Sequence, residues 1–515
     1  MKNFMNFRPF VIFALSFVIG ILSATYLFVS LNLKLIYFVL FSEIFVAFVV
    51  LFAIFRRKFL IFVSVCILFI TIPIGRLYFK QKEVEYNQRF NEKVVVINGR
   101  ICENYGFSSS GNLKLKLDNI NIVGADFKEE LDGNIVIYSN PDNYDVSKLE
   151  IGRFVSFFGT LKMNKFETGS DFSFYNLSHN IIGSCYASYS SFELKDKINT
   201  TFDEKVRNAV YQKINSFDLE YSDIGYAMMF GDESNIDDIV VNSFRTTGIA
   251  HLLAVSGLHV SILIMIISFV LKLLKASPKT RLTIIFCLLL IYCYLCDFSV
   301  SVLRASIMSV ILLYLKMKGK CYDALSAMAF SICILLLINP LNLFKVSFLL
   351  SYFAVFSITI FAQTLNFVFD KVFHKKLSNT LALNLSVQAG LIFIQLYFFE
   401  KYSILSIVCN LLSIPIATVA FTVFIAGFVI SLIFPFMSFV CGGYDYLMGL
   451  VVKLNYTISK IRLTLTINSL NFATIIFGVF ILLVISNYVF LKKRYKAIGV
   501  SLFALISSIL LFVWL

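Results

Sequence analysis

Two histidines stand close together in one long apolar stretch of the sequence. His251 and His259 are two of the four histidines in the chain, and Ser256 and Gly257 lie between them. Ionisable and polar side chains at membrane depth are costly, so they usually mark a pathway or a site. On a helix the two rings stand about 80° apart and roughly two turns along the axis, too far for both to bind one metal ion. The pair therefore either packs inside the protein with hydrogen bonds to backbone, or lines a polar path or gate.

Arg304 is a basic residue well inside another apolar run, VSVLRASIMSV. A charge at such a position must pair or face water, and Asp297, seven residues earlier, is a candidate partner. An arginine in a cavity is also a good phosphate ligand, because its guanidinium fork donates two parallel hydrogen bonds. Gln388 and Asn410 add amides on later apolar runs, where each by itself is typical of a hydrogen bond between helices. Together with the histidines and Arg304 they predict a polar path.

A short acidic segment precedes the histidines. It begins with Gly231 and Asp232 and continues with Glu233, Asp237 and Asp238. Carboxylates at a predicted helix start are typical of N-capping, which we favour over metal binding. The sequence has no H-E-x-x-H pattern, no phosphate-binding Gly-rich loop and no catalytic triad with credible spacing. We therefore expect no enzymatic activity, no metal and no cofactor.

Composition identifies the elements that must position these residues. The chain has 515 residues, of which 58% are hydrophobic, and most of it must therefore face lipid. The net charge of +14 is unevenly distributed, because residues 80–220 hold 17 basic and 20 acidic side chains. The basic excess belongs to the apolar part, where cytoplasmic loops of membrane proteins collect lysine and arginine. A DNA-binding face is a weaker explanation of the charge.

Residues 1–80 are predicted to form three transmembrane helices, at about 9–31, 35–55 and 59–79, each near the length that a spanning helix needs. Lys2 and Arg8 precede the first run, and three basic residues at 56–58 join the second to the third. Basic loops stay in the cytoplasm, so we expect the N-terminus inside and the region after the third helix outside the cell. The first run lacks a signal-peptide cleavage pattern, so we expect it to be retained.

Residues 93–190 are predicted to form a small β domain. Five short strands, at 94–101, 112–123, 133–140, 154–163 and 180–189, are separated by Gly, Asn and Asp, as in a barrel of the OB type. Tyr105 and Phe107 near a loop could stack on bases, or they could serve as core or membrane-surface anchors. Cys102 and Cys185 flank the barrel and would face an oxidising compartment. A disulfide between them and two free thiols are both open alternatives.

Residues 191–245 have helical, amphipathic spacing, typical of a linker on the outer membrane surface. Residues 246–515 follow as a transmembrane channel domain with apolar runs at about 249–274, 282–296, 300–315, 324–338, 346–369, 381–399, 404–436, 472–491 and 497–515. Basic loops alternate with loops nearly free of basic residues, a strong indication of topology. The basic loops all fall on one side of the membrane only if run 404–436 enters and leaves the membrane on the same side. Pro415 predicts two short helices hinged there, and residues 437–471 would then form an external loop.

The fold class expected is thus a polytopic α-helical membrane protein with an inserted small extracellular, OB-like β-barrel domain. The segment GDES, followed by FRTTGIAHLLAVSGLHVSIL, resembles the signature of the ComEC family of bacterial competence proteins. SVLRASIM, INPLNLFKVSFLLSYFAV and VCNLLSIPIATVAF resemble further blocks of that family in the expected order. The resemblance covers about residues 225–425. By motif match the family's residues are Gly231, Asp232, Arg245, Gly248, His251, Ser256, Gly257, His259, Arg304, Asn410 and Pro415.

The resemblance implies a channel in the cell membrane that admits one DNA strand to the cytoplasm while the other strand is degraded outside. His251, His259 and Arg304 would line the path, the glycines would allow close packing, and Pro415 would break a helix. It also implies an external DNA receptor and a cytoplasmic helicase-like motor, and it is compatible with a homo-oligomer. A separate nuclease and uptake without a nuclease are both open alternatives. Many family members continue into a metallo-β-lactamase-like domain. This sequence has no such segment, so we do not expect strand degradation from this polypeptide.

A rival hypothesis is a small-solute or lipid-head-group permease on the same scaffold, and an intramembrane enzyme using His251 or His259 is a third. Single-strand binding by residues 93–190, or a basic external funnel, would favour the channel. A narrow occluded cavity would favour the permease. The acidic balance of residues 80–220 counts mildly against a strong electrostatic funnel there.

Overall fold

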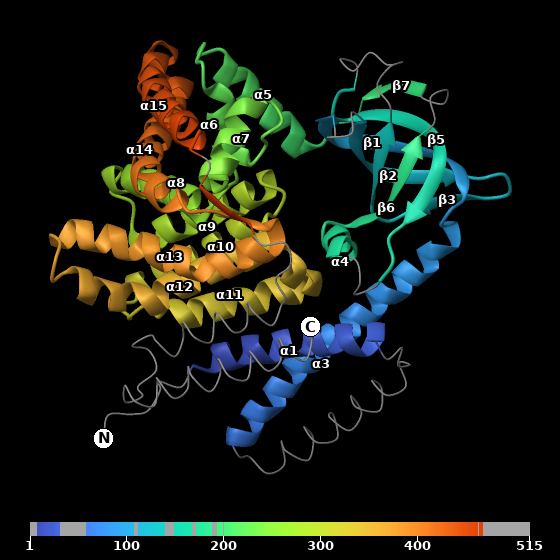
Figure 1. Ribbon diagram of the computed structural model, residues 1–515, viewed down its shortest axis with the longest axis horizontal. Helices are drawn as coiled ribbons and strands as arrows, with labels where there is room; N and C mark the ends of the chain where they lie inside the picture. The colour runs from blue at the N-terminus through green and yellow to red at the C-terminus, as the bar shows by residue number, and fades with distance from the viewer. Residues whose placement is uncertain are drawn as a thin grey trace. The chain divides into compact units, whose positions relative to one another are not determined.

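The computed structural model describes residues 8–30, 58–107, 112–139, 149–166, 171–187, 193–198, 200–461 and 463–466 (Figure 1). The chain divides into two compact units. The first unit comprises Met1–Asn208 with Ala329–Lys345, and the second comprises Ala209–Met328 with Val346–Leu515.

Two long helices begin the first unit. Helix α1 (Pro9–Ser30) packs on α3 (Lys58–Asn87), with the rings of Phe13 and Phe69 stacked at 5.2 Å between centroids. Helix α3 extends eight residues beyond its expected end, because ion pairs one turn apart, such as Lys80 with Glu83, stabilise its polar last turns. It leads through η1 (Gln88–Phe90) into the β domain. The helix expected at 35–55 and the last two apolar runs, 472–491 and 497–515, lie outside the described residues.

The β domain is a closed five-stranded barrel, which confirms the expected OB-like fold. Its strands are β1 (Val94–Phe107), β2 (Leu113–Val123), β4 (Asn134–Ser139), β5 (Arg153–Met163) and β6 (Ile181–Ala187). They follow the order β1-β2-β4-β6-β5, and pairing of β1 with β5 closes the barrel. β4 and β6 run parallel, and the other pairs are antiparallel. Alternate side chains such as Leu113, Leu115 and Leu117 fill the interior, as the period of two in the sequence requires.

Three short elements complete the domain, and one of them corrects an expectation. β3 (Lys128–Leu131) pairs with β2, and α4 (Asp171–Ser178) lies between β5 and β6 in the chain. β7 (Glu193–Ile198) is a strand where helical spacing was expected. Along β5, β6 pairs with residues 159–163, and β7 pairs with residues 153–156. Backbone groups of β5 that β6 does not reach thus gain partners from β7, and this outweighs the helical pattern.

The linker after the barrel is helical, as expected from Phe202 onward. It consists of α5 (Phe202–Asn215), α6 (Ser222–Phe230) and α7 (Asp238–Thr247). The second unit then continues with η4 (Ala250–Leu252), α8 (Gly257–Leu273), α9 (Pro278–Leu295), α10 (Val300–Met317), α12 (Val346–Phe369), α13 (Lys375–Phe399), α14 (Ser406–Ile433) and α15 (Cys441–Ser459). Helix α11 (Ala324–Ile338) is shared between the units. Among the described residues, seven helices are long and apolar enough to cross a membrane, so the chain is polytopic.

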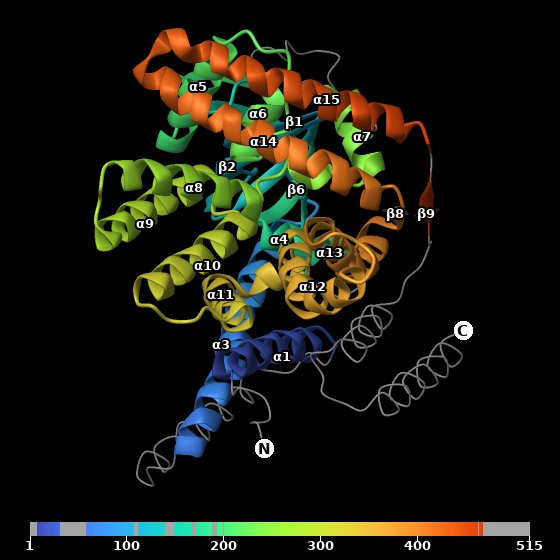
Figure 2. The same ribbon diagram turned by 90° about the vertical axis from the view of Figure 1, so that its left-hand side faces the viewer.

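The hinge expected at Pro415 is wrong, because α14 runs through it as one continuous helix (Figure 2). Proline removes one helical hydrogen bond, but neighbouring helices in membrane proteins support such positions. Here α15 packs along α14, and Asn455 donates a 2.9 Å hydrogen bond to Ser413, two residues before the proline. Residues 437–471, expected as an external loop, contain α15, which with the preceding η6 (Pro435–Val440) is itself a candidate span. Two full crossings return the chain to one side just as the predicted hairpin would.

Candidate functional site

The first turn of α8 is held by an unusual capping arrangement. Ser256 is the N-cap, and its hydroxyl accepts a hydrogen bond from the backbone N–H of Leu258 (3.3 Å). The backbone N–H of Ser256 in turn donates to Nδ1 of His259 (3.1 Å). A glutamate or glutamine usually makes this second bond of a capping box. A histidine in its place is fixed in orientation at the start of the helix.

His259 is buried, with 1% of its surface exposed, and its ring centroid lies 4.7 Å from that of Phe421 on α14. Because Nδ1 accepts from a backbone N–H, the proton of the neutral ring lies on Nε2. Nε2 is buried and has no hydrogen-bond partner among the residues that the structure describes. Buried donors are normally paired, so this N–H is available to an acceptor atom that enters the site.

Arg304 lies against the same helix start. A Cβ added to Gly257 would stand 2.9 Å from Nη2 of Arg304, so a side chain there would displace the guanidinium from its position against the helix start. Nη1 donates to the backbone carbonyl of Ser351 on α12, and the ring centroid of Tyr352 lies 5.9 Å from Cζ. The side chain is 8% exposed, and its Nε has no hydrogen-bond partner in the part of the chain that the structure describes.

Within the described part of the chain, no carboxylate forms an ion pair with Arg304. Asp297, the partner considered from the sequence, lies instead on an exposed turn after α9 with a φ of 50°. Nearly complete burial without a countercharge is costly for a cation. An anion that reached Arg304 would therefore gain a donor group that is already oriented and desolvated.

A second polar group surrounds the start of α14. Gly248 ends α7 with a φ of 77°, and a Cβ there would lie 2.6 Å from that of Ser406. Gln388 on α13 accepts a 3.0 Å hydrogen bond from the hydroxyl of Tyr402. Oδ1 of Asn410, one turn along α14, is buried and has no partner among the described residues. Close backbone packing at Gly248 thus brings the end of α7 onto a polar face of α14.

Five of the six predicted path residues fall into two groups of the second unit. Ser256, His259 and Arg304 lie at the start of α8 against Gly257, and Gln388 and Asn410 lie near the start of α14, where Gly248 packs. His251 lies on η4 and is exposed. The acceptor carbonyl of Ser351 is a backbone atom contributed by a distant helix, and no sequence pattern would have indicated it.

The remaining signature residues organise the acidic turn. Gly231 ends α6 with a φ of 84°, a conformation that favours glycine. The Asp232 carboxylate accepts from the backbone N–H of Ser234 (3.0 Å), which closes the turn. Arg245 is exposed and lies 3.6 Å from the Glu233 carboxylate. Burial raises the pKa of Glu233, and Arg245 offsets part of that effect.

Cys102 and Cys185 are both free thiols, so the disulfide alternative is wrong. Cys102 lies on β1 and Cys185 on β6, and these strands are not neighbours in the barrel. The Cys102 thiol donates to the carbonyl of Lys116 (3.3 Å), and Cys185 is part of the barrel core. Burial raises the pKa of each thiol to about 12, which keeps both in the unreactive protonated form.

The aromatic residues near the loops divide into two kinds. Tyr105 on β1 is exposed, as a stacking role requires, whereas the side chain of Phe107 lies outside the described part of the structure. Phe174 is buried and packs edge-on against Phe166 at 5.0 Å. That pair belongs to the packing of the first unit.

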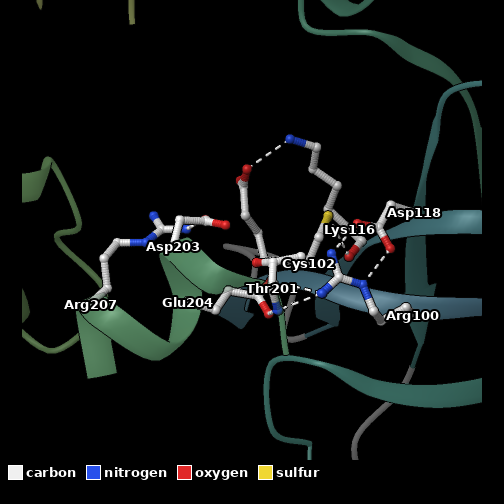
Figure 3. Close-up of polar contacts among 9 residues, drawn as sticks. Arg100, Cys102, Lys116, Asp118, Thr201, Asp203, Glu204 and Arg207 are labelled. Carbon is white, nitrogen blue, oxygen red and sulfur yellow. Dashed lines mark hydrogen bonds and ion pairs between the residues drawn. The ribbon is translucent and has the colours of Figure 1, made fainter. Parts of the chain in front are cut away.

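A buried ionic network links the barrel to the first turn of α5 (Figure 3). Arg100 donates to Asp118 through Nε (2.9 Å) and to both oxygens of Glu204 through Nη1 (2.9 Å each). Glu204 also accepts from the backbone N–H of Thr201 (2.8 Å), so it caps α5 while it pairs with the barrel. The sequence analysis missed this network. The T-x-x-E spacing at 201–204 is a capping-box signal that could have indicated the start of α5.

Three comparisons relate the chain to known proteins. The family model described as "Competence protein" matches residues 228–493, which include both polar groups of the second unit. "ComE operon protein 3" of Bacillus subtilis is 31% identical over 192 residues, which are 37% of this chain and 24% of that protein. "Recombination protein 2" of Haemophilus influenzae is 27% identical over 205 residues, 37% of this chain and 26% of that protein. The matches thus span about a quarter of each relative's length, and no solved structure matches the chain.

Proposed function

Because the chain belongs to the competence protein family, we propose that it acts in DNA uptake, as a membrane channel through which one strand enters the cytoplasm during transformation. The family match confirms the resemblance found in the sequence, and it covers just over half of the chain. The candidate spans α8 to α10 and α12 to α15 all lie within the matched residues. This segment would form the path, and the DNA strand in transit would be its substrate.

The observation that carries this proposal is the buried guanidinium of Arg304, which forms no ion pair with any carboxylate among the described residues. A DNA strand presents a phosphate at every nucleotide, and an arginine fork binds phosphate through charge-assisted hydrogen bonds. Its position against Gly257 adds the positive end of the α8 dipole, which also favours an anion. The Nε2–H of His259, which no other described residue accepts, supplies a further donor beside the same helix start. Passage would be passive, with each phosphate exchanging one set of donors for the next.

The other signature residues would serve this path in different ways. Gln388 and Asn410 would line it with amides near the start of α14, and His251 would contribute at the exposed end of the run. Gly248 and Gly257 would permit the close packing that brings the two polar groups into the bundle. Pro415 would weaken α14 at one turn without interrupting it. Gly231, Asp232 and Arg245 would shape the turn that leads into the path.

The charge pattern of the loops supports one orientation in the membrane. The N-terminus would be cytoplasmic and the barrel extracellular, because the basic residues near 2–8 and 56–58 belong inside. Residues 1–80, 93–190, 191–245 and 246–515 would then be an anchor, an external barrel, a juxtamembrane linker and the channel domain. An external DNA receptor, a cytoplasmic helicase-like motor and a separate nuclease would complete the system. Assembly into a homo-oligomer would be compatible with it.

One observation favours a second function, a small-solute or lipid-head-group permease. Residues 80–220 hold more acidic than basic side chains, so the barrel region provides no strong electrostatic funnel for DNA. A small anion would not need such a funnel and could use Arg304 alone. The two functions differ in whether labelled DNA reaches the cytoplasm.

The test compares DNA entry for the wild-type chain, Arg304→Ala and Lys316→Ala. Lys316 is an exposed cation in the last turn of the same helix and serves as the matched control. We expect Arg304→Ala to accumulate in the membrane at the wild-type level but to deliver no DNA to a nuclease-resistant state. Lys316→Ala should retain entry. Wild-type entry by a well-expressed Arg304→Ala chain would remove Arg304 from the path.

A further inference from the structure

Two tyrosines form a stacked pair on the outside of the barrel. Tyr138 on β4 and Tyr186 on β6 are register partners of the parallel strand pair. Their ring centroids lie 5.2 Å apart with an interplanar angle of 18°. Tyr186 is 58% exposed, so one side of the stacked pair faces solvent.

A lysine and a third tyrosine extend this pair across the neighbouring strands. Lys114 on β2 is the register partner of Tyr138, and its Nζ lies 6.0 Å from that ring centroid. The same Nζ lies 4.6 Å from the ring centroid of Tyr105 on β1, which is 46% exposed. Tyr105, Lys114, Tyr138 and Tyr186 thus follow one another over β1, β2, β4 and β6. We call these four residues the tyrosine row.

Cross-strand packing alone does not account for the row. Aromatic pairs between strands stabilise sheets by roughly 0.2–1 kcal/mol, and the Tyr138–Tyr186 stack provides that contribution. That stabilisation does not explain why Tyr105 and Tyr186, at the two ends of the row, are about half exposed. It also does not explain why Lys114 lies between them. The nearby Glu103 carboxylate is 2.7 Å from Nζ of Lys116, so its charge is balanced without Lys114. The row therefore offers open aromatic faces and one cation to a ligand.

We propose that the tyrosine row binds single-stranded DNA, with bases stacked on the open faces of Tyr105 and Tyr186 and a phosphate held by Lys114. Rings 5.2 Å apart leave no space for a base between Tyr138 and Tyr186, so a base would extend the stack from its open end. Stacking on tyrosine is largely independent of sequence, because every base has an aromatic face. Duplex DNA hides those faces and would bind much more weakly. The inference rests on the proposed function for its choice of DNA as the ligand.

The single cation in the row makes the salt dependence a sharp prediction. Each phosphate contact on a single strand contributes a slope of about −0.7 to log K against log salt concentration. One contact from Lys114 therefore predicts a slope near that value, far shallower than for proteins that bind DNA mainly through charge. Removing Lys114 should bring the slope close to zero, whereas removing an aromatic ring should weaken binding without changing it.

The experiment measures fluorescence anisotropy of a labelled oligothymidylate with the full chain in lipid nanodiscs. Tyr186→Ala should weaken binding about tenfold, since one base loses its stacking partner. Tyr186→Phe keeps the ring and should stay within about twofold of wild type. Lys114→Ala should weaken binding and flatten the salt slope, whereas Lys128→Ala, which removes an exposed charge from β3, should change neither. Wild-type affinity in Tyr186→Ala and Tyr105→Ala would overturn the site.

Photocrosslinking of a 5-bromouracil oligonucleotide uses the wild-type chain, so its result does not depend on whether a variant folds. We expect the crosslinked peptides to contain Tyr105 or Tyr186. Crosslinks confined to other segments would overturn the proposal, as would binding of a glycan oligomer in place of the oligonucleotide. Retained binding in a chain that fails to import DNA would refute the channel alone, and import without binding would refute the tyrosine row alone.

Discussion

Replacement of Arg304 by methionine separates a functional cation from a structural one. Methionine keeps the approximate length of the side chain and removes its charge and its donors. A buried arginine that forms an ion pair leaves a countercharge behind when it is removed, at a cost of about 3–5 kcal/mol. Among the residues that the structure describes, Arg304 has no such countercharge, and its guanidinium donates to the carbonyl of Ser351, a helical residue of α12.

The expected change in the free energy of unfolding follows from two opposing contributions. An arginine at the centre of a membrane helix costs roughly 2.5–3.5 kcal/mol on the insertion scale, and Arg304, the fifth residue of α10, costs somewhat less. A hydrogen bond that involves a charged group returns about 1.5–3 kcal/mol. The two nearly cancel, so Arg304→Met should keep the stability of the wild-type chain to within about 1 kcal/mol or exceed it.

The assay pairs thermal unfolding in nanodiscs with delivery of labelled DNA to a nuclease-resistant state in cells. We expect Arg304→Met to show an unchanged or higher midpoint of unfolding and no DNA entry. A midpoint many degrees below wild type would mean that Arg304 holds the bundle together, and the reasoning from its missing countercharge would be refuted. Full DNA entry by Arg304→Met would refute its place in the path.

Three further predictions concern the barrel and the helix ends. Glu204→Gln should destabilise the barrel by about 1.5–3 kcal/mol, because the buried guanidinium keeps only one carboxylate, and limited proteolysis between the barrel and α5 should become faster. Gly248→Ala should lower the midpoint of thermal unfolding by an amount equivalent to about 1–3 kcal/mol, since its φ of 77° disfavours a side chain and the added Cβ would meet α14. Cys102 and Cys185 should both be alkylated after denaturation without reductant, and a protected pair in the mass spectrum would contradict their assignment as free thiols.

Local patterns explain why the barrel could be predicted strand by strand. The apolar alternation of Leu113, Leu115 and Leu117 indicates both a strand and its buried face, and the other four strands carry similar signals. β7 was missed because its residues also fit a helix, and the edge of β5 that decides between the two forms is distant in the sequence. The thiols could not be assigned for the same reason, since strand order, and not spacing, separates Cys102 from Cys185.

In the membrane part, hydropathy identified most helices but misjudged α14 and α15. Asp445 and Lys453 lower the hydropathy of α15, so the sequence predicts a loop where the structure has a helix. The structure gives Asp445 a specific partner, because its carboxylate accepts from the backbone N–H of Tyr221 (2.9 Å) at the start of α6. The hinge at Pro415 was expected because proline removes a helical hydrogen bond, which is evident from the sequence. The contact from α15 that supports this part of α14 is not evident from the sequence.

At the candidate site, too, features set by neighbouring residues could be predicted from the sequence, and contacts between distant helices could not. The residue types at Ser256, His259 and Arg304 were enough to single them out as polar groups in apolar runs. The capping bond of His259 follows from a three-residue spacing and is local. The contact of Arg304 with Gly257 and with the carbonyl of Ser351 joins three helices, and only the folded chain brings them together.

The central claim is that this chain carries DNA across the membrane, and the most direct test is delivery of labelled DNA to a nuclease-resistant state in cells with and without it. If the chain is the channel, cells without it still bind DNA at their surface but protect none of it, and the wild-type chain restores protection. Equal protection in cells that lack the chain would contradict the channel and favour a permease for small anions.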